Sequence, residues 1–157
     1  RKKERVNIYH PLFDELFPQH KLYKFISCYC IQLQVRPTEI MCGKFSEIFH
    51  LGERIQEICT RHKLNICMVG HVGDGSIHPQ IPIDYNNKDE YKHYKIAKSE
   101  IYHLTVTLGG TISGEHGIGL EKKAYLPHVV EGGALDYMRQ IKKIFDPNNI
   151  LNPYKIF

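Results

Sequence analysis

A chain of 157 residues, 42% hydrophobic and 24% charged, has the composition of one soluble globular domain. The net charge of +4 is small and spread along the chain, so it favours small anionic ligands and does not indicate nucleic acid as a partner. No apolar run is long enough for a membrane span and no segment resembles a signal peptide, so we expect a cytoplasmic protein with no membrane span. Five cysteines without a CxxC pair exclude a disulfide framework and a zinc ribbon, and favour reduced thiols.

The first part of the chain, 1–34, is the least readable, because prolines and scattered aromatic residues interrupt any long periodicity. Within it we expect a short helix near 12–17 and a strand over 25–33. Val35 continues this strand, and Arg36-Pro37 ends it, since proline donates no hydrogen bond and restricts the residue before it. We therefore divide the chain into a poorly readable N-terminal segment, 1–34, and a folded domain, 35–157.

The middle of the chain alternates helical and strand patterns. Residues 44–63 have the periodicity of an amphipathic helix. A short apolar run over 64–70 then predicts a buried strand, and Ile77, Ile81 and Ile83 share one parity in a second strand, 76–83. Because a glycine-rich turn separates the two strands, we expect a β-hairpin.

The last third of the chain is predicted to be helical. A clear stripe over 90–108 predicts a helix that Gly109-Gly110 ends. A short helix over 121–130 follows, and then a longer one over 132–145. We expect the longer helix to turn its apolar residues inward, namely Leu135, Met138, Ile141, Ile144 and Phe145. The tail, 150–157, is too apolar for a free terminus, so we expect it to dock on a neighbouring surface.

Two glycine-rich turns carry the residues with the most chemical potential. His71 and His78 precede and follow the first turn, so a hairpin would let them approach each other. Glu115 and His116 lie in the second turn, 113–119. Two histidines and one carboxylate suit zinc, iron or manganese, and leave open positions as a catalytic site must. Neighbours in an extended segment point in opposite directions, so Glu115 would face a metal while His116 faces substrate.

Structural roles remain open for the same residues. His71 and His78 suit hydrogen bonds that pin a hairpin, and Asp74 suits a turn former. Glu115 suits a cap for a helix that begins near Leu120.

Three long motifs carry a resemblance to a known family. They read GHVGDGSIH over 70–78, GGTISGEHGIGLEK over 109–122 and FDPNNILNPYKIF over 145–157. In this order they resemble signatures of the C-terminal domain of the FAD-linked oxidases. This group includes the glycolate oxidase D subunit, D-lactate dehydrogenases and D-2-hydroxyglutarate dehydrogenase. The resemblance is strong over 64–157, weaker over 35–63 and absent before that.

The resemblance assigns roles by position. It implies that His71, His78 and Glu115 bind a divalent metal, for which we expect zinc or manganese. It implies that His116 is the catalytic base, and that Asn152 lies in a tail that packs near the flavin.

Two positions depart from the family pattern. Ser76 stands where asparagine is usual in the first motif. Gln80 stands where an asparagine commonly binds substrate, and it keeps an amide on a longer arm. These departures concern the choice of substrate more than the chemistry.

The resemblance also implies a fold and an activity. The fold is α+β, a small antiparallel sheet with helices on one face, resembling part of a ferredoxin-like cap domain and followed by a C-terminal helical tail. The activity is FAD-dependent oxidation of a D-2-hydroxy acid, such as glycolate or D-lactate, to the 2-oxo acid. The metal would lower the pKa of the substrate hydroxyl, a base would take its proton, and hydride would pass to FAD.

Nothing in the sequence resembles the separate domain that holds FAD in such enzymes. We therefore expect a fragment of a longer enzyme, inactive alone, whose partners are a 2-hydroxy acid, an FAD-binding domain or subunit, and an electron-transfer partner. The alternative is a non-catalytic remnant or assembly module. A metal-dependent hydrolase ranks lower, because the sequence contains no helical HExxH motif.

Overall fold

The structure, a computed structural model, describes residues 34–37 and 40–157, all within one compact unit that spans 33–157. The expected helix near 12–17 and the expected strand over 25–33 lie outside the described residues, as do Cys28 and Cys30. Cys59 is buried in the core, and Cys42 is half-buried. Within the described ranges, no helix has both the length and the apolar composition required to cross a membrane.

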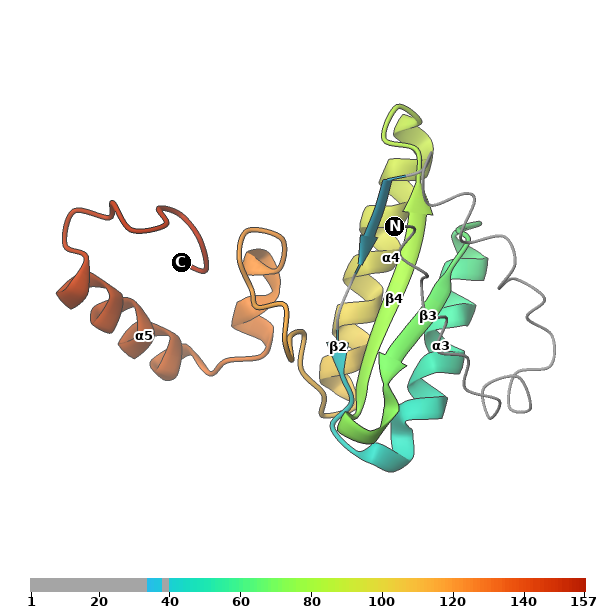
Figure 1. The fold of residues 1–157 in the computed structure, drawn as a ribbon, viewed down its shortest axis with the longest axis horizontal. Coiled ribbons are helices and arrows are strands. Elements are labelled where there is room, and N and C mark those ends of the chain that lie inside the picture. The colour runs from blue at the N-terminus through green and yellow to red at the C-terminus, as the bar shows by residue number, and fades with distance from the viewer. Residues whose placement is uncertain (1–33, 38–39) are drawn as a thin grey trace, which may run out of the picture. The chain divides into compact units, whose positions relative to one another are not determined.

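One long strand organises the sheet. β4 (Ser76–Ile83) pairs with β3 (Cys67–His71) along one edge, and with β1 (Gln34–Pro37) and β2 (Ile40–Met41) in succession along the other (Figure 1). All pairings are antiparallel. β1 and β2 follow one register, which runs from Gln34 opposite Ile83 to Met41 opposite Ser76. The described strands thus form the small antiparallel sheet that was expected.

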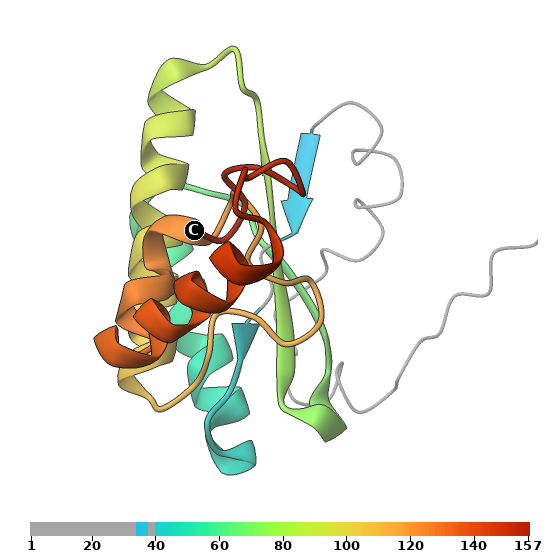
Figure 2. The same ribbon diagram turned by 90° about the vertical axis from the view of Figure 1, so that its left-hand side faces the viewer.

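Two helices cover one face of this sheet (Figure 2). α3 (Ile48–Arg61), preceded by the short 3-10 helix η1 (Phe45–Glu47), corresponds to the helix predicted over 44–63. α4 (Lys88–Thr107) corresponds to the one predicted over 90–108, and the side chain of its N-cap, Asn87, accepts a hydrogen bond from the Glu90 backbone N–H at 3.2 Å. The α+β class with helices on one face is confirmed.

The core lies between these helices and the sheet. The isoleucines of one β4 parity are buried in the same cluster as apolar residues of α3 and α4, and the cluster includes Ile77, Ile81, Ile83, Leu51, Ile55, Ala97 and Ile101. Because side chains alternate along a strand, burial of this parity sends the other parity of β4 to the opposite face.

The hairpin between β3 and β4 depends on two glycines. The connection is a 3-10 turn, η2 (Val72–Asp74), followed by Gly75 at φ 74°, a left-handed conformation that favours glycine. A Cβ at Gly70 would lie 2.2 Å from the backbone oxygen of Ser76, so only glycine lets β3 approach β4 this closely. The predicted hairpin is confirmed, and the glycine at position 70 of the first motif is explained by this close approach of the two strands.

The C-terminal part departs from expectation in its packing. The helix expected over 121–130 is a 3-10 helix, η3 (Lys123–His128), with Pro127 inside it. α5 (Gly132–Phe145) forms as predicted, yet only Leu135 is buried. The inward orientation expected for the rest of its apolar face was wrong, since Met138, Ile141, Ile144 and Phe145 are 37–79% exposed. Periodicity predicts an apolar face but cannot say which surface covers it.

The tail is held mainly by its backbone. Ile156 donates its N–H to the Gly119 carbonyl at 3.0 Å, and Lys123 Nζ donates to the Tyr154 carbonyl at 3.0 Å. Ile150 and Leu151 nevertheless remain exposed. The tail therefore docks on residues 119–123, as expected, through hydrogen bonds of its backbone.

Candidate metal centre

The face of the sheet opposite the helices carries two of the predicted ligands. In the β3–β4 pair, Val69 lies opposite His78 and His71 lies opposite Ser76. Directly opposite residues in an antiparallel pair share a face, so His71 and His78 are diagonal neighbours on one face. Their ring centroids are 5.3 Å apart, with the planes at 86°. The hairpin thus brings the two histidines together, as the motif predicted.

The second glycine-rich turn delivers a carboxylate to the same place. Glu115 Oε1 lies 3.0 Å from His78 Nε2 and 3.6 Å from His71 Nε2. His116 Nε2 lies 3.7 Å from Glu115 Oε1, and its ring centroid is 5.1 Å from that of His78. The chain bends at 114–116 and is not extended there, so both neighbours reach one cluster and the expected opposite orientation was wrong.

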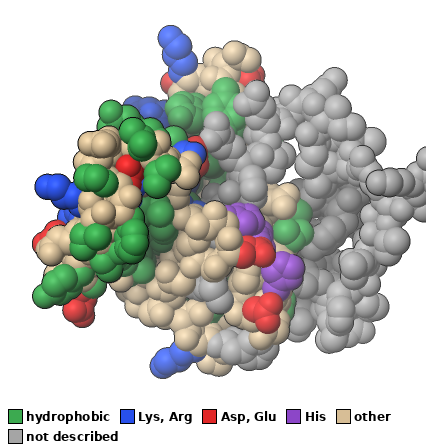
Figure 3. All heavy atoms as spheres, turned by 60° about the vertical axis from the view of Figure 1, so that its left-hand side comes forward, with side chains coloured by type: hydrophobic (Ala, Val, Ile, Leu, Met, Phe, Trp, Pro, Cys, Tyr) green, Lys and Arg blue, Asp and Glu red, His purple; other side chains and the backbone are tan. Residues whose placement is uncertain are grey.

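The spacing of the donor atoms fits a single metal ion. Ligands about 2.1 Å from one tetrahedral ion are about 3.4 Å from each other. The two nitrogens and the carboxylate oxygen all lie within 4.8 Å of one another. The side chain of His78 is 9% exposed, whereas those of His71 and Glu115 are 61% and 53% exposed. A site with one buried donor and two exposed donors is open on one side, where a further ligand has room. On the molecular surface, histidine and acidic side chains lie next to each other (Figure 3).

Comparisons with known proteins identify the family of this domain. Residues 35–156 match the family model described as FAD linked oxidases, C-terminal domain. The chain belongs to this FAD-linked oxidase family. It is 43% identical over 127 residues to glycolate oxidase subunit GlcD of Bacillus subtilis, covering 79% of this chain and 27% of that protein. It is also 38% identical over 115 residues to D-lactate dehydrogenase of Archaeoglobus fulgidus, covering 73% of this chain and 25% of that protein.

A third relative is D-2-hydroxyglutarate dehydrogenase of Stutzerimonas stutzeri, 37% identical over 94 residues, with 59% of this chain and 20% of that protein covered. The chain therefore spans between a fifth and just over a quarter of the length of these relatives.

The remaining candidate residues of this FAD-linked oxidase domain lie at different distances from the cluster. Gln80 follows His78 by two residues on β4, is half-buried and shares its face. Asn152 lies in the tail, where its exposed side chain accepts a hydrogen bond from Lys155 Nζ at 3.2 Å. This contact is outside the histidine cluster. Ser76 departs from the family motif, and its Oγ lies 3.0 Å from His78 Nε2.

The structure argues against the capping role of Glu115 and agrees with the turn-forming role of Asp74. Within the described residues no helix begins near Leu120, and the 3-10 helix that starts at Lys123 has no side-chain cap, so a capping role for Glu115 is wrong. Asp74 is exposed in the η2 turn, which agrees with a turn former.

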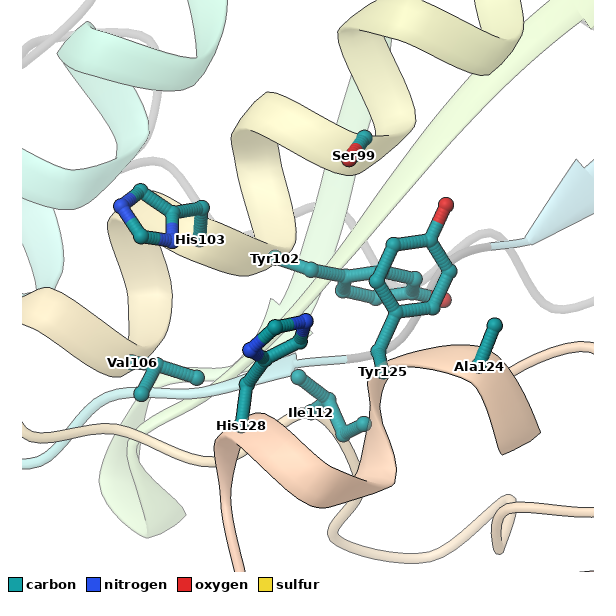
Figure 4. Close-up of a pocket in the computed structure, with 8 residues that line it drawn as sticks. All are labelled: Ser99, Tyr102, His103, Val106, Ile112, Ala124, Tyr125 and His128. Carbon is teal, nitrogen blue, oxygen red and sulfur yellow. The ribbon is translucent and has the colours of Figure 1, made fainter.

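The described residues also form a cavity away from this cluster. It has a volume of about 160 Å³ and lies between α4 and η3 (Figure 4). Its lining includes Tyr102 and Tyr125, whose ring centroids are 4.6 Å apart, and also His103 and His128. None of the clustered histidines lines it. The cavity marks where η3 packs on α4, and we assign it no part in the chemistry.

Proposed function

We propose that this domain binds the metal and the substrate for a flavin-dependent dehydrogenase that oxidises a D-2-hydroxy acid to the 2-oxo acid. The observation that carries the proposal is the convergence of two motifs, distant in the sequence, at one cluster of His71, His78, Glu115 and His116. The names of the relatives support the substrate class, because glycolate, D-lactate and D-2-hydroxyglutarate are all 2-hydroxy acids.

The residues of the cluster divide the work between them. A divalent metal would supply a Lewis acid that lowers the pKa of the substrate hydroxyl, and FAD would supply the hydride acceptor. His71, His78 and Glu115 would hold this ion, and the exposed side of the cluster would leave room for the substrate. His116, whose Nε2 lies 3.7 Å from Glu115 Oε1, would take the hydroxyl proton as the general base.

Gln80 contributes to orientation. It lies on the same face as His78, at the next position of that parity along β4. Its amide both donates and accepts hydrogen bonds, which suits a substrate carboxylate or carbonyl oxygen.

The flavin requires a further domain or subunit, and α5 offers a surface for it. Met138, Ile141, Ile144 and Phe145 form an exposed apolar face on this helix. Such a face marks an interaction surface when it is continuous. We place the FAD-binding partner of the family there, and Asn152, in the tail that follows α5, near the flavin.

Metal content tests the central claim. We expect the purified chain to bind about one zinc or manganese ion, because two histidines and a carboxylate are a sufficient set of donors. A His71→Ala/His78→Ala double variant should lose the metal. The matched control is a His103→Ala/His128→Ala double variant, which removes two exposed histidines that line the cavity between α4 and η3. Elemental analysis after gel filtration decides, and equal metal content in all three proteins would reject the site.

A further inference from the structure

Ser76 lies on the same face of the sheet as His71 and His78. It is the first residue of β4 and pairs with His71 of β3 on one side and with Met41 of β2 on the other. It is 6% exposed. A backbone held between two strands fixes the direction of the Cα–Cβ bond, so the side chain of Ser76 lies on this face of the sheet.

This hydroxyl lies among the proposed metal ligands. Ser76 Oγ is 3.0 Å from His78 Nε2, the same nitrogen that lies 3.0 Å from Glu115 Oε1. Ser76 also lies directly opposite His71, where the Cβ atoms of such a pair are about 4.5–5.5 Å apart. Its oxygen is therefore as close to one ligand atom as the ligand atoms are to each other.

A bound ion changes what this hydroxyl can do. The lone pair of His78 Nε2 cannot both accept the proton of Ser76 and coordinate a metal. When the nitrogen turns to the metal, the Ser76 hydroxyl loses this partner in a buried position, where an unsatisfied polar group is costly. An ion bound to His78 Nε2 would lie near this hydroxyl, which is 3.0 Å from the same nitrogen, and would accept its oxygen as a donor.

We propose that Ser76 Oγ is a fourth donor to the metal, bound directly to the ion together with His71, His78 and Glu115. The inference rests on the proposed metal centre and adds a residue and a preference to it. Four protein donors fill a tetrahedral zinc site, whereas a substrate needs open positions. With Ser76 bound, the ion has two oxygen donors from the protein, Glu115 and Ser76, and needs five or six ligands in all once the substrate binds. Both features favour manganese over zinc.

Cobalt is a suitable probe, because its absorption spectrum reports the number and type of its ligands. In a Ser76→Cys variant, we expect a thiolate–Co²⁺ charge-transfer band that is absent from the wild type, since a thiolate at position 76 would touch the ion. The matched control is Ser99→Cys, the same change at an exposed position of α4. A Ser76→Cys variant that binds Co²⁺ with the wild-type spectrum would overturn the proposal.

Loss of the hydroxyl gives a second, independent measurement. Ser76→Ala should weaken Mn²⁺ binding at least about tenfold, since even residues that only contact the ligands change metal affinity by that factor. It should also change the Co²⁺ spectrum, and Ser76→Thr should restore both. An unchanged spectrum with weaker binding would mean that Ser76 only orients His78, against the proposal. If wild type and His71→Ala/His78→Ala bind Co²⁺ equally, the metal centre itself fails, which is a separate result.

Discussion

His116 differs from its neighbours in the cluster because it is not one of the three residues that could share a single metal. Those residues are His71, His78 and Glu115, whose ligand atoms all lie within 4.8 Å of one another. The ring of His116 lies beside that of His78, with the centroids 5.1 Å apart. We propose it as the base because it adjoins the proposed ligands without being one of them. Its side chain is 39% exposed, so it can exchange protons with solvent.

We predict that His116→Ala lowers the rate of 2-hydroxy acid oxidation by about two to four orders of magnitude when an FAD-binding domain is supplied. Metal and flavin content should stay at the wild-type level, because the proposed ligands remain. Steady-state rates, metal content and melting temperature are measured on the same protein, with His128→Ala as the control. A purely structural role would instead lower the melting temperature, and a rate within a few-fold of wild type would rule out the base.

At the scale of the element, the hairpin formed by β3 and β4 determines where His71 and His78 lie. Gly70 lies one residue before His71 and opposite Ile77, where an added Cβ would be 2.2 Å from the Ser76 carbonyl oxygen. Gly73, in the turn itself, has no atom within 4 Å of where a Cβ would be. The same substitution at these two positions therefore separates steric crowding from a general effect of removing glycine.

We predict that Gly70→Ala destabilises the fold by about 1–3 kcal/mol, the usual cost of forcing extra atoms into a packed site. It should also weaken metal binding, because β3 must move away from β4 and carry His71 with it. Gly73→Ala should stay within about 0.5 kcal/mol of wild type. Urea unfolding gives the stabilities, and equal midpoints for the two variants would contradict the close approach.

Across the whole molecule, α3 and α4 are joined by an ionic cluster at Glu100. Its carboxylate accepts a hydrogen bond from His62 Nε2 at 2.9 Å and pairs with Arg61. Burial acts to raise the pKa of Glu100, but the hydrogen bond from His62 and the charge of Arg61 outweigh it and the pKa is lowered. Asp146, bonded by Lys142 and by the backbone N–H groups of the tail, also has a lowered pKa.

We predict that this cluster makes the stability of the fold decrease at acidic pH. A carboxyl whose pKa is lowered on folding stabilises the protein fully above its unfolded pKa, about 4.3 for glutamate, and loses this as pH falls through the folded value. The melting temperature should therefore fall below about pH 4, and Glu100→Gln should show a smaller fall, with the remainder due to Asp146 and other carboxyls. Calorimetry from pH 7 to pH 3 at constant ionic strength tests this. Parallel curves for the two proteins would remove Glu100 as a cause.

The sequence by itself determined the local elements and the residues of the centre. The spacing of apolar residues predicted α3, α4 and α5, because the 3.6-residue repeat is a local property. The parity of Ile77, Ile81 and Ile83 predicted β4, and the glycine-rich turn predicted its hairpin with β3. Motif resemblance selected His71, His78, Glu115 and His116, although no single motif contains them all.

Only the tertiary structure decided which of these groups meet. Glu115 reaches His78 because α4 carries the chain back along the sheet, a distance that no local pattern encodes. The bend at 114–116 brings Glu115 and His116 to one side, against the alternation of an extended strand. Periodicity predicted that Met138 and Phe145 point inward, yet both are exposed. The repeat of apolar residues identifies the apolar face of a helix but not the surface that covers this face. Ser76 became a candidate ligand only through its distance to His78, since a serine in a strand carries no signal of its own.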